Sequence, residues 1–121
     1  MQIRTIAELL DAKILCGEKY LDRVVNSAFG CDMMSDVLAF VKDQSVLLTG
    51  LCNPQVVRTA EMMDMQCIVF VRGKVPPQQV VDLADEAGLV VMATTERMYV
   101  ACGKLYANGL PGGEVDTRGN G

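Results

Sequence analysis

Three apolar runs recur at a constant interval in the second half of the sequence, and this rhythm constrains the fold more than any other feature. The runs cover residues 45–50, 67–71 and 89–93, so each begins 22 residues after the one before it. A short, continuous apolar run is typical of a strand that is buried on both faces, as in a parallel sheet. The interval has room for one strand, one helix and their loops. It therefore predicts consecutive strand–helix units joined by right-handed crossovers.

Helix signals follow each apolar run. Asn53-Pro54 offers a capping side chain and then a proline at the first helical position, and Pro76-Pro77 opens the next helical pattern. Residues 94–96 (Thr-Thr-Glu) are expected to open the last helix. Gly88 and Gly109 are expected to end the second and third helices.

The first third of the chain predicts smaller elements. Residues 5–8 (Thr-Ile-Ala-Glu) match a capping box and predict a short helix. Residues 13–17 indicate a short strand and turn, 24–29 a second strand, and 32–41 a helix. We therefore expect an α/β fold: a three-layer α/β/α domain with a mostly parallel sheet.

Length and composition agree with one domain. The chain has 121 residues, half of them hydrophobic, which is enough for a core without disulfides or metal. We expect a single α/β domain over residues 1–110. Residues 111–121 are rich in glycine and lack periodicity, which predicts a flexible tail.

Charge and residue usage exclude several function classes. The net charge is −4 without any basic run, which argues against nucleic acid as a partner. No apolar stretch is long enough to span a membrane, and we expect a cytoplasmic protein. The five cysteines lack paired ligand spacing, and there is no histidine, so we expect no metal site and no cofactor. The missing histidine also removes the commonest general base, and we expect a protein that is not an enzyme.

Polar chemistry concentrates between Asp22 and Asp36. Asp22 and Arg23 are interpreted as a structural pair that fixes a turn before a strand. Asp32 is interpreted as the cap of the following helix, since aspartate is favoured there. The alternative is that Asp32, Ser35 and Asp36 line a pocket mouth, where they hydrogen-bond a ribose or hold a hydrated cation.

Further candidates lie where the predicted strands give way to helices. In open α/β sheets, ligands bind outside the carboxyl ends of the strands, near helix N-termini that favour anions. Capping and turn chemistry is the alternative, because it needs the same residue types. The predicted ligand-binding residues at these positions are Thr49, Gly50, Asn53, Gly73, Thr94 and Thr95.

The order of these features resembles the DRTGG domain over nearly the whole chain. The matching features are Asp22-Arg23, the segment 30–38, Thr49, Asn53-Pro54, Gly73 before a proline-started helix, and the Thr94-Thr95 turn. Where that family often has Thr-Gly-Gly, this chain has Val71-Arg72-Gly73. An arginine is not expected to adopt the backbone conformations open to glycine, so this departure argues against a phosphate-cradling loop.

The resemblance implies a fold similar to the amino-terminal domain of HPr kinase/phosphorylase, without a catalytic site. It also implies association with CBS domains, adenine nucleotide binding by such assemblies, a homodimer, and a hydrogenase or redox enzyme as partner. The first hypothesis is therefore a non-catalytic regulatory domain that binds a small ligand. The second is a purely structural interaction or assembly protein, and the third an enzyme with a carboxylate base such as Asp32 or Asp36.

Overall fold

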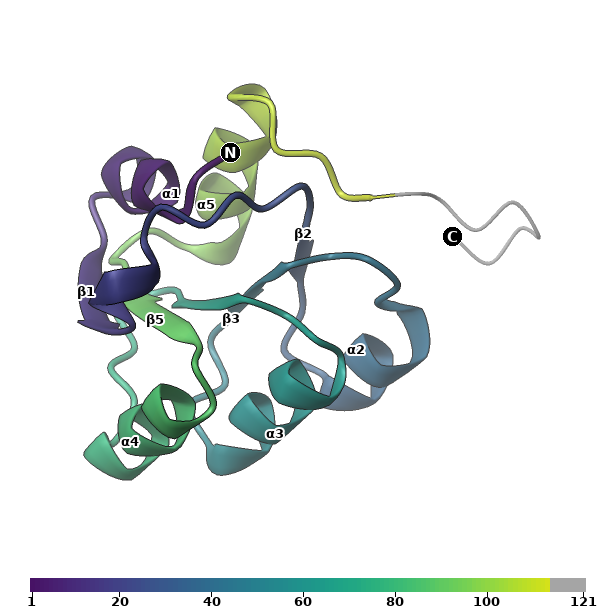
Figure 1. The fold of residues 1–121 in the computed structure, drawn as a ribbon. Helices are drawn as coiled ribbons and strands as arrows, with labels where there is room; N and C mark the ends of the chain where they lie inside the picture. Colours follow the sequence, from purple (N-terminus) through teal and green to yellow (C-terminus); the bar gives the residue numbers. More distant parts are fainter. Residues whose placement is uncertain (114–121) are drawn as a thin grey trace.

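The structure, a computed structural model that describes residues 1–113, is built around a five-stranded sheet (Figure 1). The strand order is β1-β5-β4-β3-β2, with β2, β3, β4 and β5 parallel and β1 antiparallel to β5. The strands are β1 (Lys13–Cys16), β2 (Ala28–Gly30), β3 (Val46–Thr49), β4 (Cys67–Phe70) and β5 (Val90–Ala93). The α/β fold with a mostly parallel sheet is thus confirmed.

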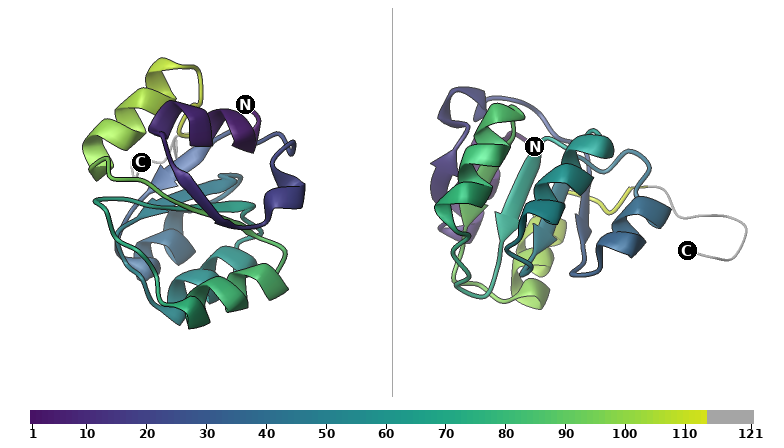
Figure 2. Two further views of the ribbon diagram at one scale, coloured as in Figure 1. Left: turned by 90° about the vertical axis from the view of Figure 1, so that its left-hand side faces the viewer. Right: turned by 90° about the horizontal axis from the view of Figure 1, so that it is seen from below.

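Helices cover both faces of this sheet (Figure 2). The helices α2, α3 and α4 pack on one face, and α1 and α5 pack on the other. Their bounds are α1 (Ile3–Leu10), α2 (Met34–Phe40), α3 (Pro54–Met62), α4 (Gln78–Glu86) and α5 (Met98–Ala107), with a 3-10 turn η1 (Glu18–Tyr20) after β1.

The three rhythmic runs form the adjacent central strands β3, β4 and β5. Val46, Cys67 and Val90 are aligned across the sheet and belong to the core under α1 and α5. The next residue of each strand points the opposite way, into the core under α2, α3 and α4. Because both faces are covered, these strands read as continuous apolar runs instead of alternating ones.

The predicted starts of α3 and α4, and the predicted end of α4 near Gly88, are confirmed. The Asn53 side chain accepts a hydrogen bond from the Val56 amide at 3.3 Å, and Pro54 is the first helical residue. Pro77 precedes α4, and Gly88 beyond its end has a φ of +75°, which glycine adopts without steric cost.

The start of α1 differs from its prediction. The helix begins at Ile3, two residues before the expected capping box, so Thr5 lies inside the first turn. The amides of Ile3 and Arg4 donate to the backbone carbonyls of Arg23 and Leu21, at 3.0 and 2.9 Å. A neighbouring segment therefore satisfies the first amides, and no side-chain cap is needed.

Three other elements, β2, α2 and α5, are shorter than predicted. The segment 24–29 contributes only residues 28–30 to the sheet, while Val24 makes a single antiparallel bridge to Gln2. The helix α5 begins at Met98 because the Thr94 hydroxyl serves other groups. It accepts from the Glu96 amide at 3.2 Å and donates to the Leu10 carbonyl at 2.7 Å.

Asp22 and Arg23 do not act as a pair, so that interpretation was wrong. Asp22 forms an exposed ion pair with Arg4 at 3.0 Å. The guanidinium of Arg23 stacks on the Tyr20 ring, 3.6 Å from its centroid. It also donates to the Gln66 side chain and to the Gly88 carbonyl, both at 3.1 Å.

The first residues of the expected tail lie against the sheet. The Pro111 carbonyl accepts from the Ala28 amide of β2 at 3.0 Å, and the Gly112 carbonyl accepts from the Gln44 side chain at 2.8 Å. Residues 114–121, the rest of that prediction, lie outside the described part of the chain. Among the described residues, no helix is long and apolar enough to cross a membrane.

The contrast between Asp22 and Arg23 gives a stability prediction. Arg23→Ala leaves a half-buried carbonyl and amide without their donor, so we expect the free energy of unfolding to fall by about 1–3 kcal/mol. Asp22→Ala removes only an exposed ion pair, and we expect a loss of about 1 kcal/mol or less. Urea denaturation of the two variants measures the difference; equal losses would contradict the assignment.

Candidate functional site

The carboxyl ends of the four parallel strands meet at one edge of the sheet. Asp32 follows β2, Thr49 ends β3, Arg72 follows β4 and Thr94 follows β5. These strands are neighbours in the order β2-β3-β4-β5, so their following loops are also neighbours. We refer to this region as the carboxyl edge.

The Asp32 carboxylate is bound to the end of β3. Its Oδ1 accepts a hydrogen bond from the Gly50 amide at 2.7 Å and another from the Thr49 hydroxyl at 3.0 Å. The Thr49 side chain is fully buried, and its hydroxyl also accepts from the Leu51 amide at 3.1 Å.

The interpretation of Asp32 as a helix cap was therefore wrong. Met33 occupies the cap position of α2 and makes no side-chain capping hydrogen bond. The carboxylate is not available to α2 because donors from β3 and its following loop already hold it.

Arg72 lies in a tight turn after β4. Its backbone is left-handed, a conformation that was not expected for an arginine from the sequence. Arg72 and Gly73 both have positive φ, 64° and 71°, and the Lys74 amide donates to the Val71 carbonyl at 3.2 Å. A left-handed arginine costs roughly 1–2 kcal/mol. Two further hydrogen bonds secure the turn, from the Arg72 amide to the Glu96 carbonyl at 2.7 Å and from the Gly73 amide to the Thr94 carbonyl at 3.0 Å.

This turn directs the Arg72 side chain back across β3. A Cβ atom added to Gly50 would lie 2.7 Å from Nε of Arg72, so the guanidinium occupies the space that glycine leaves open. One guanidinium nitrogen lies 3.8 Å from Asp32 Oδ2, and the two side chains are 47% and 49% exposed. The pair is loose and half open to solvent.

The other predicted site residues have separate roles. Asn53 caps α3, while Ser35 and Asp36 lie in the first turn of α2, where the Cys31 thiol lies 4.0 Å from Asp36 Oδ2. Thr95 is exposed. The structure thus joins Asp32, Thr49 and Gly50 by hydrogen bonds, and links Gly73 to Thr94 through the backbone.

Arg72 was missed as a site residue. Its position directly after a buried strand and beside Gly73 could have identified it. From the sequence, this arginine was instead interpreted as a departure from the Thr-Gly-Gly motif.

Thiol and metal chemistry have little support at this edge. Burial raises the pKa of the Cys52 thiol, and the nearby cations Lys74 and Arg72 only partly offset that rise. A thiol with a raised pKa is a poor nucleophile near neutral pH. Within residues 1–113, no group of three or more histidine, cysteine or acidic side chains is placed to hold a metal ion.

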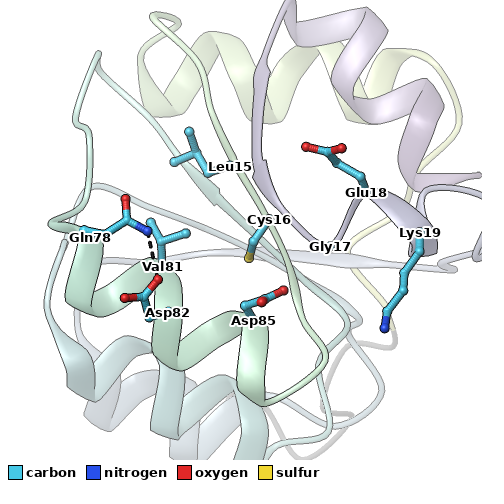
Figure 3. Close-up of a pocket in the computed structure, with 9 residues that line it drawn as sticks. All are labelled: Leu15, Cys16, Gly17, Glu18, Lys19, Gln78, Val81, Asp82 and Asp85. Carbon is cyan, nitrogen blue, oxygen red and sulfur yellow. Dashed lines mark hydrogen bonds between the residues drawn. The ribbon is translucent and has the colours of Figure 1, made fainter.

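Two hollows lie away from this edge. One of about 420 Å³ lies between β1 and α4, with the Cys16 thiol facing Asp82 and Asp85 of α4 (Figure 3). The pKa of the Cys16 thiol is raised, chiefly by burial. The two nearby carboxylates add to the rise. A second hollow, an apolar groove of about 410 Å³, runs beside α5 over β2 and β3. Neither of these two hollows is lined by any of the nine predicted site residues.

The carboxyl edge offers two complementary binding groups. The Arg72 guanidinium presents donors to an anion, and arginine binds carboxylates and phosphates through paired hydrogen bonds. Within residues 1–113, Asp32 Oδ2 accepts no hydrogen bond and is approached by Arg72 at 3.8 Å, so it can accept one from a ligand hydroxyl. This arrangement supports binding of a small ligand that carries both kinds of group.

Comparisons with known proteins agree with the fold. The model of the DRTGG domain matches residues 5–106. No curated protein matches the sequence at a significant level. Among solved structures, the fold is similar to the CBS and DRTGG domains of the regulatory region of Clostridium perfringens pyrophosphatase, complexed with its activator diadenosine tetraphosphate.

That similarity has a TM-score of 0.69 at 15% sequence identity and covers 91% of this chain. This chain spans about half, 47%, of the pyrophosphatase chain. Because the family model covers most of the sequence, from the first helix to the last, the chain belongs to the DRTGG domain family.

Proposed function

We propose that this domain is a non-catalytic regulatory module that binds an adenine nucleotide at the carboxyl edge and acts on a partner enzyme. The observation that carries the proposal is the half-exposed Arg72 guanidinium, which lies over Gly50 and 3.8 Å from Asp32. An arginine held in a costly backbone conformation, with its charge directed over a strand end, is better explained by a ligand than by stability.

The geometry suits the two polar parts of a nucleotide. A phosphate would bind Arg72, with Lys74 of the same turn adding positive charge nearby. A ribose hydroxyl would donate to Asp32 Oδ2, as acidic residues do in dinucleotide-binding sheets. The N-terminus of α3 begins beside this loop and also favours an anion.

The structural neighbour supports the choice of ligand. The Clostridium perfringens region is described as regulatory and is complexed with a diadenosine activator. That protein and this one share only 15% identity, so the nucleotide is transferred here as a proposal. The five cysteines are free, which is consistent with a reducing, cytoplasmic location.

Calorimetric titration tests the ligand. We expect binding of at least one of AMP, ADP, ATP and the diadenosine polyphosphates at millimolar concentration or below. Arg72→Gln removes the phosphate contact and should weaken binding about tenfold or more, since a hydrogen bond to a charged group contributes about 1.5–3 kcal/mol. Gly50→Ala should act in the same direction, because the added methyl displaces the guanidinium without altering its charge.

A matched control separates site charge from total charge. Arg58 is an exposed arginine of α3 that makes no ion pair with any residue in the described range 1–113, and Arg58→Gln should leave the affinity unchanged. Flat titrations of the wild-type protein with every nucleotide would remove the nucleotide proposal.

The helix α5 supports a homodimer. Apolar side chains surround it almost completely, although only one side faces the core, and Lys104 is its only charged residue. Tyr99 and Tyr106 are 82% and 72% exposed and border the apolar groove. A helix that is apolar on all sides is normally buried on all sides. We propose that a second copy of this chain covers this surface.

Light scattering tests the dimer. We expect twice the monomer mass at micromolar concentration, and Tyr106→Glu should shift the mass to that of the monomer, because it places a charge in the proposed interface. Met62→Glu is the control, since Met62 is equally exposed, at 72%, but lies on α3 across the sheet. Monomer mass for the wild-type protein over a wide concentration range would overturn the dimer.

The helix α2 supports contact with a partner enzyme. Met33, Leu38 and Phe40 are 60%, 43% and 49% exposed, and this segment directly follows Asp32. A ligand at the carboxyl edge would therefore contact the loop that leads into an exposed apolar helix. We propose a hydrogenase-related or other redox enzyme as the partner. The same apolar surfaces favour the alternative, a purely structural assembly protein without a ligand.

Gentle co-purification from the native host tests the partner. We expect a redox enzyme to be recovered with the wild-type protein and to be reduced several-fold with Phe40→Glu. Recovery that is unchanged by added nucleotide, together with flat titrations, would favour the assembly alternative. Recovery of no partner would contradict both the regulatory proposal and the assembly alternative.

A further inference from the structure

The donors at the end of β3 are already occupied by an anion of the protein itself. The Gly50 amide and the Thr49 hydroxyl both donate to Asp32 Oδ1, at 2.7 and 3.0 Å. Amides at the carboxyl end of a parallel strand are where open α/β sheets commonly bind phosphate. At this strand end, the carboxylate of Asp32 stands in for a ligand's phosphate oxygen.

We propose that Asp32 is a specificity-determining residue that keeps phosphate groups away from the end of β3. This inference rests on the proposed function and concerns the same site. A phosphate approaching the Gly50 amide would meet a carboxylate that holds both donors, and the like charges would repel at contact distance. The open side of Arg72, 3.8 Å from Asp32 Oδ2, is then the remaining place for a single phosphate group.

The arrangement selects a class of ligand. Beside the phosphate position on Arg72, Asp32 presents an oxygen that only a donor can satisfy. A phosphate ester with adjacent sugar hydroxyls meets both requirements. Inorganic phosphate and pyrophosphate have no sugar hydroxyl, and their negative charge would lie directly beside the carboxylate. Asp32 therefore favours nucleotides over the inorganic anions.

A purely structural role for Asp32 makes a different prediction. If the carboxylate only ties the loop before α2 to β3, its removal lowers stability and leaves the affinity for anions unchanged. If it excludes phosphate, its removal increases that affinity. Binding of an inorganic anion therefore separates the two roles.

Inorganic pyrophosphate is the probe, with affinity measured by calorimetry and the Gly50 amide followed by nitrogen-15 NMR. Asp32→Asn removes the charge but keeps an oxygen for both donors, and we expect pyrophosphate to bind about tenfold more tightly than to the wild-type protein. Asp32→Ala also frees the donors, so we expect a larger gain and a shift of the Gly50 amide on binding. In the double variant Asp32→Ala/Arg72→Gln, the gain should largely disappear.

Asp36→Asn is the matched control, because it removes a carboxylate from the first turn of α2 without freeing the Gly50 amide. Its affinity for pyrophosphate should equal that of the wild-type protein. Wild-type affinity in both Asp32 variants would overturn the inference, and Asp32→Asn decides alone if Asp32→Ala does not fold. The result is independent of the nucleotide titrations: a gain for pyrophosphate with no nucleotide bound by the wild-type protein would remove the proposed ligand and leave the exclusion by Asp32 standing.

Discussion

The in-register pairing of β2, β3, β4 and β5 is the constraint on which the other features depend. Parallel pairing aligns Val46, Cys67 and Val90 on one face and their successors on the other, so both cores follow from one register. A slip of one residue would exchange the two faces and place the same side chains against the wrong helices. The same pairing brings four loops from distant parts of the sequence to a common edge. The pairing of the strands therefore brings the residues of the candidate site together, although they are far apart in the sequence.

The sequence was most informative where the pattern and the physics were local. Continuous apolar runs predicted β3, β4 and β5, and the Asn53-Pro54 and Gly88 signals located the ends of α3 and α4. The start of α1 was missed because its first amides bond to the segment around Arg23, a contact between residues about 20 positions apart. Propensity rules describe a helix in isolation and cannot register a carbonyl supplied by another part of the fold.

The candidate site shows the same limit more sharply. Asp32 is of a residue type that is favoured at helix N-caps. Only the structure shows that its carboxylate is hydrogen-bonded to the end of β3 instead. Arg72 was discounted because a left-handed arginine is uncommon, yet backbone hydrogen bonds from the turn to Glu96 and Thr94 hold it there. An unfavourable local conformation is stable when its surroundings determine it, and such positions are often functional.

Both outer edges of the sheet carry a feature that disfavours pairing with a further strand. On one side, the Pro111 carbonyl takes an outward amide of β2, and a proline has no amide with which to extend the pairing. On the other, the register of β1 shifts between Ile14 and Cys16, and such an irregularity disrupts the regular edge that an incoming strand would need. These features disfavour edge-to-edge pairing, a common route to aggregation for small sheet proteins. Assembly is then favoured through the helices and loops, which are the parts that the proposed ligand at the carboxyl edge would contact.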